Sequence, residues 1–201
     1  MILLKVQGQD VFFQQPRVGK NLQPFNILKF TTMHKGSEKF GSLTLGNDSR
    51  VTLTGRILRK LKLNELPQLI NVLKGEMSFV GPRPLTKNEV EKHYSKCIRS
   101  KIYSVKPGIT GCGSLEFNQE ESDLENCIDP NEFFATVIMP KKAELECWYI
   151  DNQSFWLDLS ILYRTVFRLG ISFVIFFLYQ LKKRLQGLPR TNSKTDTQPD
   201  Q

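Results

Sequence analysis

The segment LKLNELPQLINVLKGEMSFVGPRP, Leu61 to Pro84, restricts the local fold more than any other part of the chain. Four apolar residues in it recur at the spacing of one helix face: Leu66, Leu69, Ile70 and Leu73. Pro67 has no backbone N–H and is tolerated only in a first helical turn. Gly75 follows the last apolar residue, where helices commonly end on glycine. These signals predict a short helix that begins near Asn64 and ends before Gly75.

We expect Asn64 to be the N-cap of this helix, with Glu65 immediately inside it. An N-cap lies beside unpaired backbone N–H groups and the positive end of the helix dipole, so the position favours an anion, and Asn is also a common cap. Two interpretations are therefore open. Asn64 is only a cap, or Asn64 and Glu65 belong to a functional site. This window alone favours the first interpretation.

A Pro-Arg-Pro turn follows an apolar, strand-like piece in SFVGPRPL. Pro82 and Pro84 fix the backbone on both sides of Arg83, which lowers the entropy lost when its guanidinium binds an anion. A rigid surface turn with a solvated arginine is the simpler alternative. A second turn, rich in Pro and Gly, is predicted at KPGITGCGS, residues 106–114.

The positive charge is concentrated in one part of the chain. The 201 residues carry a formal net charge of +8 and have a pI of about 9.4. Residues 50–106 contain 13 Lys and Arg against four Glu, a net charge of +9, whereas the remaining chain has 15 basic and 16 acidic residues. The excess predicts an anionic partner such as a phosphate, a membrane surface or a nucleic acid. A nucleic acid is the least favoured, because no aromatic residues alternate with the cations as a stacking platform would require.

The remaining patterns predict an α+β fold with a small β-hairpin and several helices. Residues 11–33 read as strand, turn and strand, with Arg17 in the turn and Lys29 at the end of the second strand. A short helix is expected after Thr54, an acidic loop over residues 116–132, and an amphipathic helix from about Phe133 to Tyr149.

The run LGISFVIFFLYQL, residues 169–181, has no charge and is followed by a cluster of cations. Its 13 residues would cover about 20 Å as a helix, less than the roughly 30 Å of a hydrocarbon core. We therefore expect a helix over residues 169–186 that lies at a membrane interface, with its cations among anionic headgroups. A buried core helix is the alternative. Residues 187–201 are polar and are expected to be disordered.

Three stretches resemble the bacterial sugar transferase family, the monotopic polyprenyl-phosphate phosphoglycosyl transferases. They are NDSRVTLTGRILRKLKLNELPQLINVLKGEMSFVGPRPL, then VKPGITG, then YIDNQSFWLDLSIL. The likeness extends from about Val11 to Arg168 and consists of several ordered motifs. It implies a sugar transferase domain over residues 1–168 with a membrane-associated monotopic fold. Members of the family usually have an N-terminal re-entrant membrane helix, and here only MILLKVQGQD precedes the hairpin.

The resemblance implies a membrane enzyme at the cytoplasmic face of the bacterial inner membrane. It would transfer a phospho-sugar from a nucleoside diphosphate sugar, typically a UDP-sugar, to polyprenyl (undecaprenyl) phosphate. This step would initiate synthesis of a cell-surface polysaccharide, lipopolysaccharide or glycan. The family mechanism uses an Asp-Glu pair with Mg²⁺, so the implied partners are the nucleotide sugar, the lipid phosphate and membrane lipid, with no nucleic acid. Association into homo-oligomers through the apolar C-terminal helix is a further option.

By this resemblance, the Asp-Glu pair corresponds to Asn64 and Glu65, with Glu65 as the metal ligand. Pro82 and Pro84 shape the site. Positions implied in binding the substrate phosphate or nucleotide are Arg17, Lys29, Arg50, Arg56, Arg83 and Glu146. Asn64 stands where the family has its nucleophilic aspartate, and a carboxamide is a poor nucleophile. The alternative is therefore a catalytically impaired homologue that still binds a nucleotide sugar or lipid phosphate.

Overall fold

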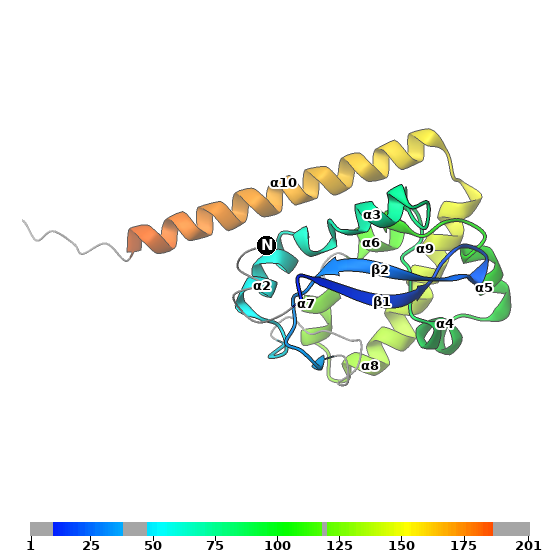
Figure 1. Ribbon diagram of the computed structural model, residues 1–201, viewed down its shortest axis with the longest axis horizontal. Helices are drawn as coiled ribbons and strands as arrows, with labels where there is room; N and C mark the ends of the chain where they lie inside the picture. Colours follow the sequence, from blue (N-terminus) through cyan, green and yellow to red (C-terminus); the bar gives the residue numbers. More distant parts are fainter. Residues whose placement is uncertain (1–9, 38–47, 118–119, 187–201) are drawn as a thin grey trace, which may run out of the picture.

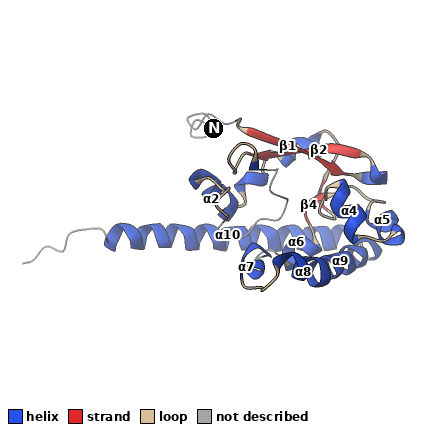
Figure 2. Cartoon of the chain, turned by 90° about the horizontal axis from the view of Figure 1, so that it is seen from below, coloured by secondary structure: helices blue, strands red, loops and turns tan. Residues whose placement is uncertain are grey.

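The computed structural model describes residues 10–37, 48–117 and 120–186, and the fold over these residues is α+β with helices predominating (Figure 1). It contains two small two-stranded sheets, β1-β2 and β3-β4. The hairpin lies on one side of the molecule, and helices α7, α8 and α9 lie on the other (Figure 2). The predicted α+β class, with a small hairpin and several helices, is confirmed. The predicted disordered tail, residues 187–201, lies outside the described residues.

The predicted hairpin is formed by β1 (Phe12–Val18) and β2 (Pro24–Phe30), joined by the short helix η1 (Lys20–Leu22). Lys29 lies near the end of β2, as predicted. The placement of Arg17 in the turn was wrong, because Arg17 lies within β1 and pairs with Phe25. Pairing continues through Val18, whose N–H also donates to the carbonyl of Leu85, so the turn begins only at Gly19.

The helix predicted after Thr54 begins slightly earlier, as α2 (Leu53–Lys60). Its N-cap is Thr52, whose hydroxyl accepts a hydrogen bond from the N–H of Gly55. A Cβ at Gly55 would lie 2.0 Å from the carbonyl oxygen of Thr32. Only glycine allows α2 to pack this closely on the segment that follows β2.

The N-cap prediction for Asn64 is wrong. Asn64 lies inside a single 3₁₀ turn, η3 (Leu63–Glu65), and the α-helical part, α3 (Gln68–Leu73), starts only after Pro67. Pro67, three residues after Asn64, has no N–H that an Asn64 cap could accept from. The N–H of Leu66 bonds to the carbonyl of Leu63, three residues back, as in a 3₁₀ turn. Gly75 has a φ of 77° just past α3, as the sequence predicted.

The Pro-Arg-Pro turn follows β3 (Ser78–Val80), which pairs in parallel with β4 (Gly108–Thr110). The sequence predicted only a turn over residues 106–114, but this segment contains β4 and the start of α6 (Cys112–Glu116). Gly108 explains the difference, since a Cβ there would lie 2.1 Å from the backbone nitrogen of Gly81. The glycines that suggested a turn instead permit close strand packing.

The main core packs α4 (Lys87–His93), α5 (Lys96–Ile102) and α9 (Met139–Asp151) against the hairpin. The helix predicted from Phe133 is confirmed, although it comprises the π-helical segment η4 (Phe134–Ile138) followed by α9. The acidic segment predicted as a loop instead contains two short helices, α7 (Glu120–Glu125) and α8 (Pro130–Phe133). The second of these is capped by Asp129, whose carboxylate accepts two backbone hydrogen bonds.

The C-terminal apolar segment belongs to one continuous helix, α10 (Phe155–Gln186), which runs through the expected boundary at residue 168 (Figure 1). Its first half packs against β3, β4 and α6, and the hydroxyl of Tyr149 on α9 donates to Asp158 at 2.7 Å. Residues Phe155–Leu178 form a 24-residue stretch that is long and apolar enough to cross a membrane, and only 6% of its most apolar window is buried. The uncharged run alone therefore underestimated the apolar length.

The apolar face predicted for α3 is exposed rather than buried. Its members are 41–87% exposed: Leu66, Leu69, Ile70 and Leu73. The buried face of α3 is polar instead, and it holds Gln68 and Asn71. Periodicity therefore identified the helix but not the side that faces the protein.

Asn71 connects this buried face to the hairpin. Its side chain is fully buried, its Oδ1 accepts from the N–H of Leu28 at 3.0 Å, and its Nδ2 donates to the carbonyl of Asn26 at 2.8 Å. A third hydrogen bond, of 2.7 Å, links Nδ2 to Glu76. These bonds satisfy edge groups of β2 that would otherwise be buried without partners.

We predict that Asn71→Leu destabilises the fold by roughly 2–4 kcal/mol, because the N–H of Leu28 and the carbonyl of Asn26 lose their partner. Urea unfolding of the detergent-solubilised protein measures the change. Asn88→Leu is the matched control, since Asn88 is exposed on α4, and it should change stability by less than about 0.5 kcal/mol. Equal stabilities for the two variants would contradict this role.

Candidate active site

Glu65 lies at the centre of a cluster of cations that comes from three separate elements. Its Oε1 is 3.1 Å from Nζ of Lys29, on β2, and 3.3 Å from Nη2 of Arg83, in the Pro-Arg-Pro turn. The side chain of Glu65 is 17% exposed, and that of Lys29 is 19% exposed. The turn of η3 therefore holds a mostly buried carboxylate between two cations that lie 36 and 18 residues away in the sequence.

The cluster changes the acidity of all three groups. Burial alone would raise the pKa of Glu65, but the charges of Lys29, Arg83 and Lys62 outweigh it and hold this pKa well below its usual range. Burial lowers the pKa of Lys29 to about 8, although Glu65 acts in the opposite direction. The charge of Glu65 raises the pKa of Arg83. Glu65 is thus a carboxylate at neutral pH and presents an anion among cations.

Arg17 lies behind this cluster and holds the Pro-Arg-Pro turn. Its Nη1 is 3.1 Å from Oε2 of Glu89 and 3.5 Å from the carbonyl of Pro84, and its Nη2 donates to Gln15 at 2.6 Å. Glu89 also forms a capping box with Thr86 at the start of α4. The sequence prediction of Arg17 as a site residue is therefore compatible with a role in fixing the position of Arg83.

Glu146 is buried on α9, with 3% of its surface exposed. The backbone N–H groups of Arg83 and Gly113 donate to its carboxyl group, whereas its Oε2 has no hydrogen-bond partner within the described residues. Burial raises the pKa of Glu146 to about 7, against the opposing effects of these N–H groups and of Lys142. Glu146 thus contacts the Pro-Arg-Pro turn and α6 together.

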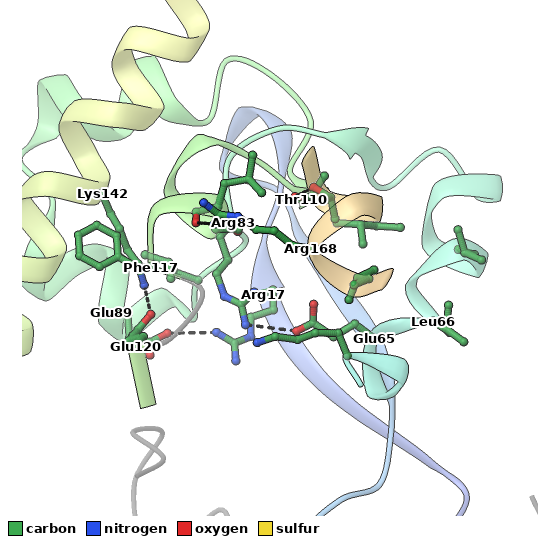
Figure 3. Close-up of a pocket in the computed structure, with 18 of the residues that line it drawn as sticks. Arg17, Glu65, Leu66, Arg83, Glu89, Thr110, Phe117, Glu120, Lys142 and Arg168 are labelled. Carbon is green, nitrogen blue, oxygen red and sulfur yellow. Dashed lines mark hydrogen bonds and ion pairs between the residues drawn. The ribbon is translucent and has the colours of Figure 1, made fainter. Parts of the chain in front are cut away.

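A cavity of about 390 Å³ opens beside the cluster (Figure 3). Its volume lies in the range of small-molecule sites. Glu65, Arg17 and Arg83 line it, together with residues of β4, α6, α9 and α10. In Figure 3, Arg83 lies between Glu65 on one side and Phe117, Glu120 and Lys142 on the other. The lining residues on α10 include Thr165 and Arg168, so this apolar helix forms one wall of the cavity.

The structure brings together some of the residues implied by sequence and not others. Glu65, Arg17, Lys29, Arg83 and Glu146 lie in or directly behind the cavity wall. Arg50 is paired with Asp48 at 2.6 Å, Arg56 is exposed on α2, and neither lines the cavity. Asn64 does not line it either, although its Oδ1 is buried without a partner among the described residues.

Several lining residues were missed by the sequence analysis. Lys142 precedes Glu146 by one helical turn on α9, and this spacing could have linked the two. No comparable signal marks Phe117, Phe134 or Arg168, because these positions become neighbours only when α6, η4 and α10 pack together.

Mg²⁺ can be tested against this donor set. Among the described residues, no group of three or more His, Cys, Asp or Glu is placed to hold a metal ion. Mg²⁺ commonly uses only one or two protein oxygens and completes its shell with water and substrate phosphate. The carboxylate of Glu65, which lines the cavity, is an oxygen donor of the required kind. The residues therefore fit a phosphate-bound Mg²⁺ but not a closed protein cage.

The chain matches the sequence profile described as bacterial sugar transferase over residues 1–171. The uncharacterized sugar transferase EpsL of Bacillus subtilis is 40% identical over 86% of this chain and 75% of its own length. Exopolysaccharide production protein ExoY of Rhizobium meliloti is 35% identical over 83% of this chain and 73% of its own length. UDP-glucose:undecaprenyl-phosphate glucose-1-phosphate transferase of Escherichia coli is 38% identical over 79% of this chain, which spans 32% of that relative.

The match covers most of the chain, including η3, the Pro-Arg-Pro turn and the cavity walls described above. The Escherichia coli relative is named for a reaction of UDP-glucose with undecaprenyl phosphate, and a relative from Aeromonas hydrophila, 36% identical over 82% of this chain, is named for a reaction of UDP-N-acetylgalactosamine with undecaprenyl phosphate. The resemblance of the sequence motifs is thereby confirmed at the level of the family. The chain belongs to the bacterial sugar transferase family.

Proposed function

We propose that this protein transfers a phospho-sugar from a UDP-sugar to undecaprenyl phosphate and so initiates synthesis of a cell-surface polysaccharide. The observation that carries the proposal is the buried carboxylate of Glu65 between Lys29 and Arg83 at the edge of a 390 Å³ cavity. Phosphoryl transfer depends mainly on positioning and charge neutralisation, and this arrangement supplies both. The names of the relatives support the choice of substrates.

The proposed reaction has two displacements. In the first, a carboxylate oxygen of η3, from Glu65 in this chain, forms a bond to the sugar-linked phosphorus. The bridging P–O bond to the nucleotide breaks, and UMP leaves with the bonding electron pair. An oxygen of undecaprenyl phosphate then attacks the same phosphorus, and the carboxylate leaves. Neither step needs net proton transfer. Arg83 and Lys29 would neutralise the charge that spreads over the phosphoryl oxygens.

Mg²⁺ is the proposed cofactor, held by Glu65 together with substrate phosphate. When bound, it would supply charge neutralisation for the diphosphate. The residues of the chain keep separate roles. Arg83 holds a phosphoryl oxygen, and Arg17 holds the turn that carries Arg83 through its contact with the carbonyl of Pro84.

The alternative proposal is a catalytically impaired homologue that still binds the nucleotide sugar or the lipid phosphate. The observation that favours it is Asn64 at the position of the family's aspartate, because a neutral carboxamide cannot form the acyl-phosphate bond. In this case the cations around Glu65 would retain an anion site without turnover.

We predict that Asn64→Asp releases UMP from a UDP-sugar and undecaprenyl phosphate at least about 100-fold faster than the unmodified protein, because the variant regains a carboxylate nucleophile. UMP release by purified full-length protein with Mg²⁺ and a panel of UDP-sugars is the measurement. The matched control, Asn88→Asp on exposed α4, should leave the rate unchanged.

Glu65→Gln then separates the two proposals. If the unmodified protein releases UMP and Glu65→Gln abolishes the release, Glu65 acts as the nucleophile. Asn64 then does not impair the enzyme. Activity absent from both the unmodified protein and Asn64→Asp would contradict the proposed reaction for this chain.

We also propose that the protein is held at the cytoplasmic face of the bacterial inner membrane. The support is α10, with its exposed 24-residue apolar stretch, and the exposed apolar face of α3 beside the basic α2. Apolar side chains at this scale are unfavourable in water and favourable in a bilayer.

We predict that the full-length protein sediments with membranes and that the double variant Phe173→Lys and Phe177→Lys moves it largely to the soluble fraction. Each lysine in the middle of an apolar helix costs about 2.5–3.5 kcal/mol on insertion. Ile128→Lys, at another exposed apolar position, is the control and should not change the distribution. Recovery of the unmodified protein in the soluble fraction at low salt would contradict membrane association.

Glu146 is proposed as a positioning residue for Arg83, through the backbone N–H of Arg83 rather than through its guanidinium. Its pKa of about 7 lies above the ordinary value of 4.5. The folded protein therefore retains a proton that the unfolded chain releases between these pH values. Because the folded state binds more protons there, this group lowers stability as the pH rises through that window.

We predict that Glu146→Gln removes this pH-dependent loss of folding stability. The difference in stability between the variant and the unmodified protein should therefore shift in favour of the variant as the pH rises from 5 to 8. The gain is on the order of 3 kcal/mol at most. Urea unfolding at both pH values measures it. Glu144→Gln, on the exposed face of the same helix, is the control and should leave the pH dependence unchanged. The same pH dependence in all three proteins would show that Glu146 is already ionised at pH 5.

A further inference from the structure

The cavity has a second wall that the proposed chemistry around Glu65 does not use. We call it the aromatic–lysine wall, and it consists of Phe117, Glu120, Phe134 and Lys142. These residues come from the end of α6, the start of α7, η4 and α9. Two aromatic rings, a cation and an anion therefore meet in this wall. Figure 3 shows Phe117, Glu120 and Lys142 apart from Glu65, on the other side of Arg83.

Lys142 is the centre of this wall. The residue is only 7% exposed, and its ammonium is 5.6 Å from the ring centroids of both Phe117 and Phe134. Its Nζ is also paired with Glu120. Burial lowers the pKa of Lys142, and the charge of Glu120 partly offsets this effect. Burying an ammonium is unfavourable unless it is paired, so the ion pair and the rings are what keep a cation at the cavity wall.

The position of this wall relative to η3 is informative. Phosphoryl transfer places the attacking and leaving oxygens approximately in line through the phosphorus. The attacking group of this reaction comes from η3, which carries positions 64 and 65 at the Glu65 end of the cavity. In Figure 3 three members of this wall, Phe117, Glu120 and Lys142, lie on the far side of Arg83 from Glu65. A phosphate held by Arg83 would therefore direct its leaving group toward this wall.

We propose that the aromatic–lysine wall binds the nucleoside monophosphate half of the substrate, a pyrimidine nucleotide. Phe117 and Phe134 provide apolar ring surface for the base. Lys142 balances the phosphate charge that grows on the leaving nucleotide, and Glu120 accepts hydrogen bonds from ribose hydroxyls. The proposal rests on the proposed function, because only the leaving-group geometry of that reaction places the nucleotide here.

The test is direct binding of UMP to the full-length protein in detergent, measured by titration calorimetry without turnover. Phe134→Leu and Lys142→Met should each weaken binding about tenfold or more, since they remove a stacking surface and a cation. The chain offers a matched control beside each position. Phe133→Leu and Lys141→Met change neighbouring residues that do not line the cavity, and they should bind UMP as the unmodified protein does.

Kinetics in the Asn64→Asp background distinguish a role of these residues in nucleotide binding from a purely structural role. In it, Phe134→Leu should raise the KM for the UDP-sugar and leave the KM for undecaprenyl phosphate unchanged. Lys142→Arg keeps the charge and should retain most of the affinity for UMP. If Lys142→Met does not fold, Phe134→Leu and Phe117→Leu decide the question alone.

The outcomes distinguish this inference from the proposed function. Equal affinity for UMP in the wall variants and their controls would overturn the nucleotide site while leaving the transferase reaction intact. Absence of UMP binding to the unmodified protein would overturn it as well. Absence of turnover in Asn64→Asp, with UMP binding still dependent on Phe134 and Lys142, would instead refute the reaction and retain the nucleotide site.

Discussion

The ion cluster of Glu65, Lys29 and Arg83 is the interaction on which the rest of the site depends. A buried carboxylate is unfavourable unless cations and hydrogen bonds compensate for the water it loses. Here the compensation comes from the second strand of the hairpin and from the Pro-Arg-Pro turn, so the same contacts that neutralise Glu65 also bring β2, η3 and that turn together. Removing the carboxylate would leave two close cations facing each other. The same ion pairs therefore determine both the shape of the cavity at this end and its charge.

Asn64 has a particular meaning beside this cluster. The cations Lys29, Arg83 and Lys62 act on one carboxylate here, whereas an aspartate at position 64 would add a second. A neutral side chain therefore leaves the immediate surroundings of Glu65 more positive. Such a site would hold a substrate phosphate firmly, even where the chemistry that follows is slow. Affinity for the anion and nucleophilic reactivity are thus separable properties in this arrangement.

Much of the local structure could be predicted from the sequence, because local signals decided it. The hairpin, the glycine that ends α3 and the helix from Phe133 follow from turn chemistry and periodicity. The failures have physical causes. Pro67 replaced an Asn64-capped helix by a 3₁₀ turn, and glycines at positions 81 and 108 allowed strands to pair where a turn was expected. Arg17, Lys29 and Arg83 carried a family signal, whereas Phe117, Phe134 and Arg168 acquire a shared role only through tertiary packing, which no local pattern records.

The helix α10 also contributes to the wall of the cavity. Its residues Thr165, Arg168 and Leu169 line the cavity, and the hydroxyl of Thr165 is hydrogen-bonded at 2.8 Å to that of Thr110 on β4. The helix is continuous from these contacts into its apolar second half. With α10 in the membrane as proposed above, a change in bilayer thickness that tilts this helix would also move one wall of the cavity. Bilayer thickness would then influence the shape of the cavity through the tilt of α10.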